Sequence, residues 1–433
     1  MNNRFHRVFG LAVILIVLGG CGNKQPVPAD EVTAIINAKI FDGENLIDDT
    51  VVVFKGAFIQ AVGGEVPAGA RIFDAQGATL MPGLIDSHTH TDIDGLRDAL
   101  LFGVTTELEM NGAWSAKQRK DIAERTDVAD LRSPGMGVTP KGGHPTEYAA
   151  SSNILMRLFV RFFFPSVKNP QEAVKFVDKQ IRGGADYIKV FIENGNYIGY
   201  PGLPLLDDET LQAAVDESHR NNKMAIAHVT TLDGGRQAIA AGVDGLAHLF
   251  FDKQPDAEFI ADIAASGAFV IPTLVTLSTA FGNDARLLAA DERVSSRLDQ
   301  KWLDSLSRSM NVHPHGKMED AFAAVMELHH AGVDILAGSD VSDPLPTLGG
   351  LAHGASLHHE LRLLVAAGFT PAEALRAATS VPARRFALDD RGRIAAGLRA
   401  DLLLIDGDPL ANIDDTLSVN AVWKNGVKLG VLK

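Results

Sequence analysis

The feature that most constrains the fold is an alternation of short apolar runs with helical patterns between residues 81 and 388. Such alternation is typical of parallel βαβ units, and a series of eight predicts a (β/α)8 TIM barrel, an α/β fold. An open doubly wound sheet is the alternative, but no Gly-x-Gly-x-x-Gly motif follows an early run to support it. The expected strands are Leu84–His90, Val104–Met110, Gly135–Thr139, Tyr187–Ile192, Ala225–Val229, Gly245–Phe250, Phe269–Leu274 and Ile335–Asp340.

Two further groups of short β-type runs lie on either side of this region, within residues 32–80 and 389–433. The second group contains Asn425-Gly426, a strong hairpin signal because both central positions of a type I′ turn need positive φ. Small β segments at opposite ends of a chain are expected to pair with each other. We therefore expect a composite β-sandwich domain of residues 32–80 and 389–433, beside a barrel domain of residues 81–388.

The first twenty residues have the character of an export signal. Arg4 and Arg7 precede a short apolar run, Val8–Leu18, which is too short to span a bilayer. The small residues before Cys21 resemble the lipobox of bacterial lipoproteins, in which the cysteine carries the lipid. This resemblance implies a signal peptide over 1–20, lipidation of Cys21 and a tether over 21–31. The protein would then be exported and anchored to a membrane, on the periplasmic side or at the cell surface; an uncleaved N-terminal anchor is the alternative.

The composition excludes several other classes of protein. The chain has 54 acidic and 40 basic residues, a formal net charge of −14 and no basic run, so it is poorly suited to binding nucleic-acid phosphates. Hydrophobic residues make up 46% and charged residues 22%, which is a globular composition. The single cysteine excludes a disulfide framework and a zinc or iron–sulfur site built from cysteines.

Polar side chains interrupt two of the expected apolar strands. His88 and His90 are alternate residues of the first strand, so both side chains point to one face. Lys189 lies within the fourth strand, and lysine is seldom buried without a partner. A desolvated lysine loses its proton easily and can react with carbon dioxide, which gives a carbamate suited to bridging two cations. The alternatives are a hydrogen-bonded pair of core histidines and a lysine that reaches solvent.

Three more polar residues stand near the C-terminal ends of later strands. His228 and His248 belong to the fifth and sixth strands, and Asp340 ends the eighth. In a (β/α)8 barrel these strand ends form the functional face. Six side chains that are costly to bury would then share one face, which predicts a metal site of His88, His90, Lys189, His228, His248 and Asp340.

The chain resembles the amidohydrolase superfamily in its two-metal form with a carboxylated lysine. Residues Met81–His90 match the first-strand signature of that family, and Ala396–Leu402 resembles its return into the β domain. The sequence looks most like the imidazolonepropionase-related branch, which includes prolidase-like dipeptidases. The resemblance implies two divalent ions, usually zinc: one bound by His88, His90 and Asp340, the other by His228 and His248, with carbamylated Lys189 bridging both.

The resemblance also implies a reaction, hydrolysis of a C–N bond in an amide or small peptide by a metal-bridged hydroxide. Two close cations lower the pKa of a shared water, and one of them polarises the carbonyl group. Asp340 would act as the proton shuttle, and His144, after the third strand, would donate to the carbonyl oxygen. A lactonase or other ester hydrolase is the alternative, because the same hydroxide attacks either carbonyl. A noncatalytic lipoprotein that captures a ligand is the alternative from another class.

Four residues are candidate substrate contacts. Thr230 stands two residues after His228, where peptidase relatives often have a tyrosine, and this departure puts peptide substrates in doubt. His353 lies near the expected rim, and Arg157 and Arg161 lie in an apolar stretch that suits a substrate pocket or a membrane surface, with ordinary packing of a helix against the barrel as the alternative. We expect a small-molecule partner, a membrane contact through Cys21, no nucleic acid and, as a default, a homo-oligomer.

Overall fold

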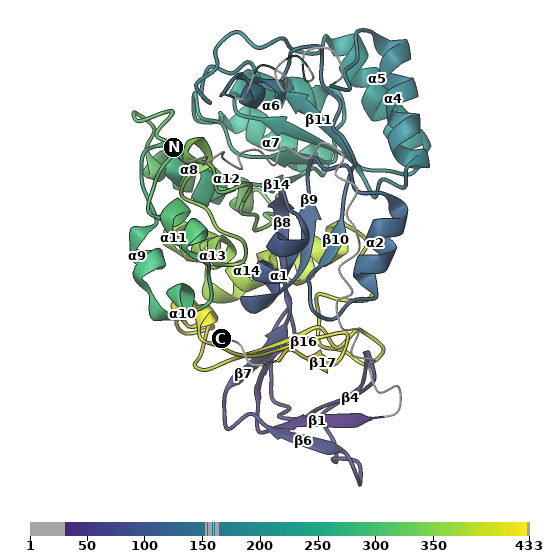
Figure 1. Ribbon diagram of the computed structural model, residues 1–433, viewed down its shortest axis with the longest axis vertical. Coiled ribbons are helices and arrows are strands. Elements are labelled where there is room, and N and C mark those ends of the chain that lie inside the picture. The colour runs from purple at the N-terminus through teal and green to yellow at the C-terminus, as the bar shows by residue number, and fades with distance from the viewer. Residues whose placement is uncertain (1–30, 152–153, 155–157, 159, 161–163, 431–433) are drawn as a thin grey trace, which may run out of the picture.

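The computed structural model describes residues 31–430 except 152, 153, 155–157, 159 and 161–163 (Figure 1). The expected signal peptide, Cys21 and nearly all of the tether lie outside the described residues, as do Arg157 and Arg161. Within the described part, no helix is both long enough and apolar enough to cross a bilayer.

Parallel strands form the centre of the molecule, and helices surround them (Figure 1). The strands make a three-stranded sheet of order β10-β9-β8 and a four-stranded sheet of order β11-β12-β13-β14. Every pair in both sheets is parallel, as expected for strands joined through helices. Their bounds are β8 (Leu84–Thr89), β9 (Val104–Glu109), β10 (Asp130–Arg132), β11 (Ile188–Ile192), β12 (Ala225–Val229), β13 (Gly245–Ala247) and β14 (Phe269–Ile271).

Most of the helices between and after these strands begin at a polar capping residue. Asn169, Asp207, Thr231 and Asp256 each accept a hydrogen bond from a backbone N–H of the first turn that follows. The helices are α1 (Ile93–Leu101), α2 (Ala116–Ala123), α4 (Pro170–Arg182), α5 (Asp208–Arg220), α6 (Leu232–Ala240), α7 (Ala257–Ser266), α8 (Leu274–Ala280), α9 (Arg286–Ala290), α10 (Glu292–Ser295), α11 (Gln300–Leu306), α12 (Met318–His330), α13 (Ala355–Ala367), α14 (Pro371–Ala377) and α15 (Ser380–Arg385). Three 3₁₀ turns cover Thr146–Ser151, Pro346–Leu348 and Ile413–Leu417.

The third and eighth expected strands differ from the prediction. The segment Gly135–Thr139 forms only a single bridge, from Val138 to Val190, and β10 takes the place beside β9 instead. Gly135 has a φ of +70°, and this conformation interrupts a regular strand. The segment Ile335–Asp340 likewise contributes only single bridges, from Ile335 to Val270 and from the adjoining Val341 to Thr89. The bridges of Ile335 and Val341 link β14 to β8, and Val138 bridges to β11, but the ladders within the described residues do not form a closed barrel.

The two ends of the described chain meet in two further sheets at the bottom of Figure 1. One sheet has the order β5-β4-β1-β6, and the other has the order β17-β16-β15-β7-β2-β3. Antiparallel pairing of β15 with β7, for example Leu404 with Leu80, brings the C-terminal segment onto the N-terminal one. The strands are β1 (Val32–Ile36), β2 (Lys39–Phe41), β3 (Leu46–Ile47), β4 (Val52–Lys55), β5 (Phe58–Val62), β6 (Arg71–Asp74), β7 (Thr79–Pro82), β15 (Leu402–Ile405), β16 (Val419–Lys424) and β17 (Val427–Lys428).

A common apolar cluster lies between these two sheets. It includes Ile35 and Phe54 from the first sheet and Leu80, Leu404 and Trp423 from the second, all nearly inaccessible to solvent. The two ends of the chain therefore pair as expected, while the β-sandwich and the exact domain boundaries stay a prediction.

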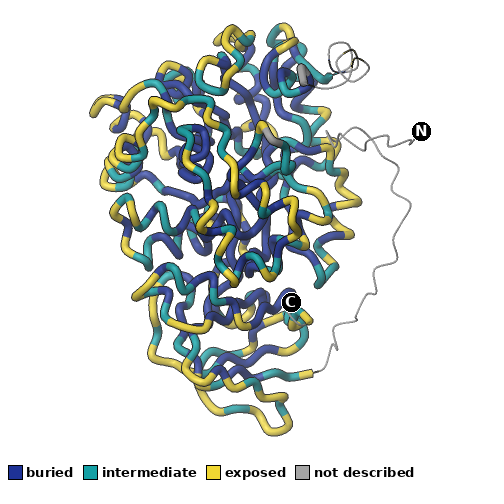
Figure 2. The backbone as a smooth tube through the Cα atoms, turned by 60° about the vertical axis from the view of Figure 1, so that its left-hand side comes forward, coloured by how far each residue is buried: buried dark blue, intermediate teal, exposed yellow. Residues whose placement is uncertain are grey.

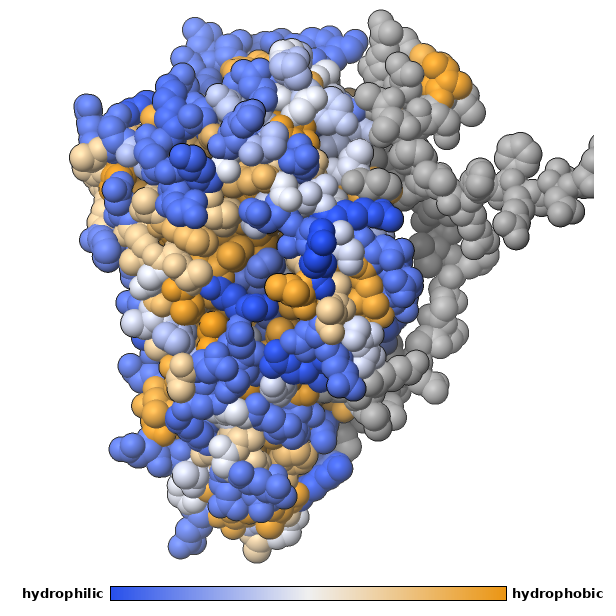
Figure 3. All heavy atoms as spheres, turned by 90° about the vertical axis from the view of Figure 1, so that its left-hand side faces the viewer, coloured by the Kyte–Doolittle hydropathy of each residue, from blue (hydrophilic) through white to orange (hydrophobic). Residues whose placement is uncertain are grey.

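Buried residues concentrate on the central strands and on the inner sides of the helices, whereas exposed residues lie in outer turns and helix faces (Figure 2). The side of the molecule that carries α9 and α11 is a mosaic in which hydrophilic residues surround smaller apolar areas (Figure 3). The C-terminal ends of β8, β12 and β13 carry the histidines singled out from the sequence, whereas Lys189 is the second residue of β11.

Candidate metal centre

The best-defined polar cluster is formed by His88, His90 and Asp340. One ligand atom of each lies within 4.8 Å of the others. The Nε2 atoms of His88 and His90 are each 3.2 Å from Oδ1 of Asp340. The two histidines share a face because they alternate at the end of β8, and Asp340 reaches them because its backbone N–H donates to the carbonyl of His88.

His228 and His248 continue this cluster. The ring centroid of His248 is 4.8 Å from that of His88 and 4.7 Å from that of His228. His228 belongs to β12, and His248 follows directly after the neighbouring strand β13. The structure thus brings together histidines from three strand ends.

Lys189 lies on β11, which pairs in parallel with the strand of His228. Its side chain is 1% exposed, and its Nζ atom has no hydrogen-bond partner among the described residues. Burial lowers the pKa of Lys189 to about 7, so a neutral amine is accessible near neutral pH. Charge on Lys189 also acts on the pKa values of His88, His228 and His248, which shows that it lies within electrostatic reach of all three.

His88, His90 and Asp340 fit a divalent cation. Imidazole and carboxylate are ligands that zinc accepts, and a lysine carbamate would add two more oxygens. Nδ1 of His88 and Nζ of Lys189 are buried without partners in the described part of the chain, which is costly for a polar atom. Ion binding and carboxylation of Lys189 would relieve part of that cost.

Unusual backbone conformations accompany the cluster. His248, Thr273 and Asp340 have φ values of 76°, 45° and 54°, in the left-handed region that residues with a Cβ atom seldom adopt. His248 directly follows β13, Thr273 directly precedes α8, and Asp340 precedes the bridge residue Val341, so each unusual conformation changes the direction of the chain beside the site. Gly338 permits a close approach of the chains here, because a Cβ atom at that position would lie 3.0 Å from the backbone nitrogen of His88.

Electrostatics also distinguish the members of the cluster. Burial opposes ionisation of Asp340, but His88 and His248 hold its pKa well below the usual range. Burial lowers the pKa values of His228 and His248 and keeps both imidazoles neutral, as metal binding requires. Burial also disfavours the charged form of His90, yet the nearby carboxylates of Asp340 and Glu109 raise its pKa to about 9.

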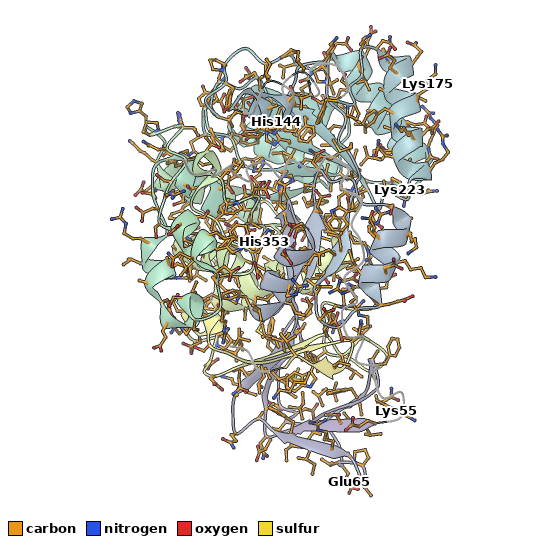
Figure 4. The ribbon with its side chains drawn as sticks, viewed as in Figure 1. Lys55, Glu65, His144, Lys175, Lys223 and His353 are labelled. Carbon is orange, nitrogen blue, oxygen red and sulfur yellow. The ribbon has the colours of Figure 1, made fainter. Side chains whose placement is uncertain are left out.

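His144 lies at the edge of this cluster, with its ring stacked on His228 at a centroid distance of 4.4 Å. Its Nδ1 is 2.5 Å from Oε1 of Glu147, and both side chains are buried. His353 lies farther away and contacts Glu107, with 3.1 Å between Nδ1 and Oε1. Figure 4 shows His144 and His353 in the central α/β part, well away from Lys55 on β4 and from Glu65 in the loop after β5.

Comparison with known proteins identifies the family of this chain. The profile of the Amidohydrolase family matches residues 79–429. The chain belongs to the amidohydrolase family. Over 413 residues it is 26% identical to an imidazolonepropionase of Deinococcus radiodurans, covering 87% of this chain and 90% of that protein. Over 441 residues it is 24% identical to an ochratoxinase of Aspergillus niger, covering 89% of this chain and 83% of that one.

A solved structure shares the fold of this amidohydrolase. It is a Xaa-Pro dipeptidase with methionine bound in the active site, 21% identical, with a TM-score of 0.69. The alignment covers 92% of this amidohydrolase and 100% of the dipeptidase chain. Solved structures of this family are of the TIM-barrel type, so the fold of the chain is α/β with barrel-type neighbours.

Sequence reasoning missed the carboxylates that contact the histidines of this amidohydrolase. Glu193 contacts His228, Glu147 contacts His144, and Glu109 lies 3.7 Å from Nδ1 of His90. A signal for Glu193 was present, because residues 189, 191 and 193 alternate and so share a strand face. Thr230, expected as a substrate contact, is 2% exposed and donates its hydroxyl hydrogen to Glu193; its contact with substrate stays a prediction.

Proposed function

We propose that this amidohydrolase is a metal-dependent hydrolase that cleaves a C–N bond in an amide or small peptide. The observation that carries the proposal is the convergence of four histidines and Asp340 beside a buried lysine without a hydrogen-bond partner among the described residues. The relatives support it, since an imidazolonepropionase, an ochratoxinase and a Xaa-Pro dipeptidase are all hydrolytic enzymes. A complete (β/α)8 barrel with a small β-sandwich is the fold we propose for it.

The proposal assigns a binding role to each ligand. His88, His90 and Asp340 would hold one divalent ion, His228 and His248 the second, and carbamylated Lys189 would bridge them. Zinc is the metal that this donor set favours. When bound, the two ions would lower the pKa of a water molecule and polarise a carbonyl group.

The protein's own residues would move the proton and stabilise the developing charge. The low pKa of Asp340 keeps its carboxylate ionised, so it can accept a proton from the attacking water and pass it to the leaving amine. Glu147 accepts the Nδ1 hydrogen of His144, and with both ring nitrogens protonated, Nε2 of His144 would donate a hydrogen bond to the carbonyl oxygen. The lipid anchor at Cys21 and an exported, membrane-bound location are part of the same proposal.

A substrate panel tests this function. The purified, zinc-loaded protein is assayed against dipeptides, N-acyl amino acids and lactones, and we expect turnover of at least one amide class. Asp340→Asn should lower kcat by at least about 100-fold, because general acid–base catalysis supplies roughly that much. Its melting temperature should stay close to that of the unchanged protein. Lactone turnover without amide turnover would favour an ester hydrolase, and unchanged kcat in the variant would exclude the proton shuttle.

A further inference from the structure

Two neighbouring imidazoles of the site are each held by a buried carboxylate, but through opposite ring nitrogens. His144 and His228 stack with an interplanar angle of 29°. Glu147 contacts Nδ1 of His144, whereas Glu193 contacts Nε2 of His228 at 3.0 Å. The free nitrogen is therefore Nε2 on His144 and Nδ1 on His228.

Glu193 is itself held in place from three sides. It follows β11, and the register that pairs Phe191 with His228 brings its side chain to the histidine. Its Oε1 accepts a hydrogen bond of 2.6 Å from the backbone N–H of Gly195. Its Oε2 accepts the hydroxyl hydrogen of Thr230 as well as contacting His228. The side chain is 1% exposed, so this carboxylate is committed to contacts within the protein.

The chemistry of imidazole gives these contacts a consequence. A neutral imidazole has one N–H donor and one nitrogen lone pair, and a carboxylate selects the tautomer whose N–H points to it. Glu193 thus fixes the lone pair of His228 on Nδ1, and Glu147 fixes the N–H of His144 on Nδ1. His228 would then act as a metal ligand, whereas His144 would face the substrate.

We propose that Glu193 is a positioning residue that presents Nδ1 of His228 to the metal ion that His228 and His248 would hold, and that Thr230 holds Glu193 in the required orientation. This inference rests on the proposed function, because it assumes that His228 binds an ion. Carboxylates that orient a metal-binding histidine contribute about 10- to 100-fold to metal affinity. Thr230 then acts through Glu193, at the position where related peptidases place a tyrosine.

Metal retention tests the inference without any substrate. The full-length protein and its variants are loaded with Zn²⁺ and titrated with a chromogenic chelator, and the zinc remaining per chain is measured. We expect Glu193→Ala to lose one of two zinc ions at about 10- to 100-fold lower chelator concentration than the unchanged protein. Glu193→Gln keeps an acceptor oxygen, so its zinc retention should lie between that of Glu193→Ala and that of the unchanged protein. Thr230→Val should weaken retention, and Thr230→Ser should restore it.

Glu147→Ala is the matched control, because it removes a carboxylate that is also buried from the stacked partner histidine. We expect it to retain both zinc ions like the unchanged protein. Equal zinc retention in Glu193→Ala and the unchanged protein would overturn the inference, and so would equal loss in Glu147→Ala and Glu193→Ala. If the unchanged protein fails to bind two ions, the proposed function fails instead. Circular dichroism identifies a variant that does not fold, and the Glu193→Gln and Thr230→Ser results then decide the question.

Discussion

At the scale of single residues, burial changes the chemistry of Lys189. In water a lysine amine is protonated at neutral pH, but in this site its pKa falls to about 7 because the charged form loses its hydration. The neutral amine is a nucleophile that carbon dioxide can carboxylate. Burial on the apolar strand β11 therefore gives Lys189 a reactive amine near neutral pH, which an exposed lysine would not have.

We predict that zinc alone will not fully reactivate the metal-stripped enzyme, and that zinc with bicarbonate will. With a pKa of about 7, the neutral fraction of Lys189 rises from about one tenth at pH 6 to about nine tenths at pH 8. The reactivation rate should rise accordingly when dissolved carbon dioxide is held constant, as measured by activity recovered against time. Lys189→Ala should recover no activity under either condition. Full recovery in the absence of carbon dioxide would contradict the carbamate.

At the scale of elements, α8 begins directly after the residue that holds His248. Thr273 contacts Nδ1 of His248 with its hydroxyl oxygen at 2.7 Å. The next two backbone N–H groups, of Leu274 and Val275, donate to the buried carboxyl of Glu360 on α13. The side chain of Glu360 on α13 therefore binds the first backbone N–H groups of α8, beside His248, which is a proposed metal ligand. Burial raises the pKa of Glu360 from 4.5 to about 8.

This raised pKa predicts how stability changes with pH. The folded protein binds the Glu360 proton more tightly than the unfolded chain, so this contribution is complete below about pH 4.5 and is lost as pH rises through about 8. Glu360→Gln removes the titration. The melting temperature of this variant relative to the unchanged protein should therefore increase between pH 5 and pH 9, by about 2 °C.

Glu373→Gln is the control for this measurement. Burial opposes ionisation of Glu373, but its hydrogen bonds to Thr370 lower its pKa, so its contribution to stability is complete above about pH 4.5, is lost only at lower pH, and does not change between pH 5 and pH 9. A relative melting temperature of Glu360→Gln that stays constant from pH 5 to pH 9 would show that the Glu360 carboxyl does not titrate there.

At the scale of the whole molecule, an ionic cluster joins the central strands to the terminal sheets. Asp130 on β10 contacts Arg391 and Arg399, which lie in the segment that leads to β15. Arg399 also pairs with Asp401, and Nζ of Lys424 lies 3.9 Å from the same carboxylate. All five side chains are buried, so each charge depends on its partners for stability.

We predict that Asp130→Asn lowers the free energy of unfolding by about 3–5 kcal/mol, because it leaves buried arginine charges uncompensated. Asp127→Asn is the matched control. Asp127 pairs with Arg125 while its side chain is 49% exposed, and such a pair contributes about 0–1 kcal/mol. Urea unfolding of the three proteins measures the difference, and similar unfolding midpoints for both variants would show that the buried cluster adds no stability.

Local patterns predicted much of this protein. The two-residue period of a strand is sufficient to place His88 and His90 on one face, and alternation of strands with helices predicted the α/β class. The first and fifth strands begin at the expected residues, Leu84 and Ala225. The position predicted for the third strand was wrong. Gly135 has a positive φ, which interrupts regular strand pairing there, and β10 pairs with β9 instead.

The sequence by itself determined the residues that are costly to bury, the class of fold and the family signature, because these depend on neighbours within a few positions. Only the tertiary structure decided which groups meet. Glu193 and His228 are 35 positions apart and come into contact through the register of β11 with β12. The left-handed backbone at His248 and Asp340 likewise depends on contacts between strands. Such pairings are set by packing between distant segments, and no local pattern of residues encodes them.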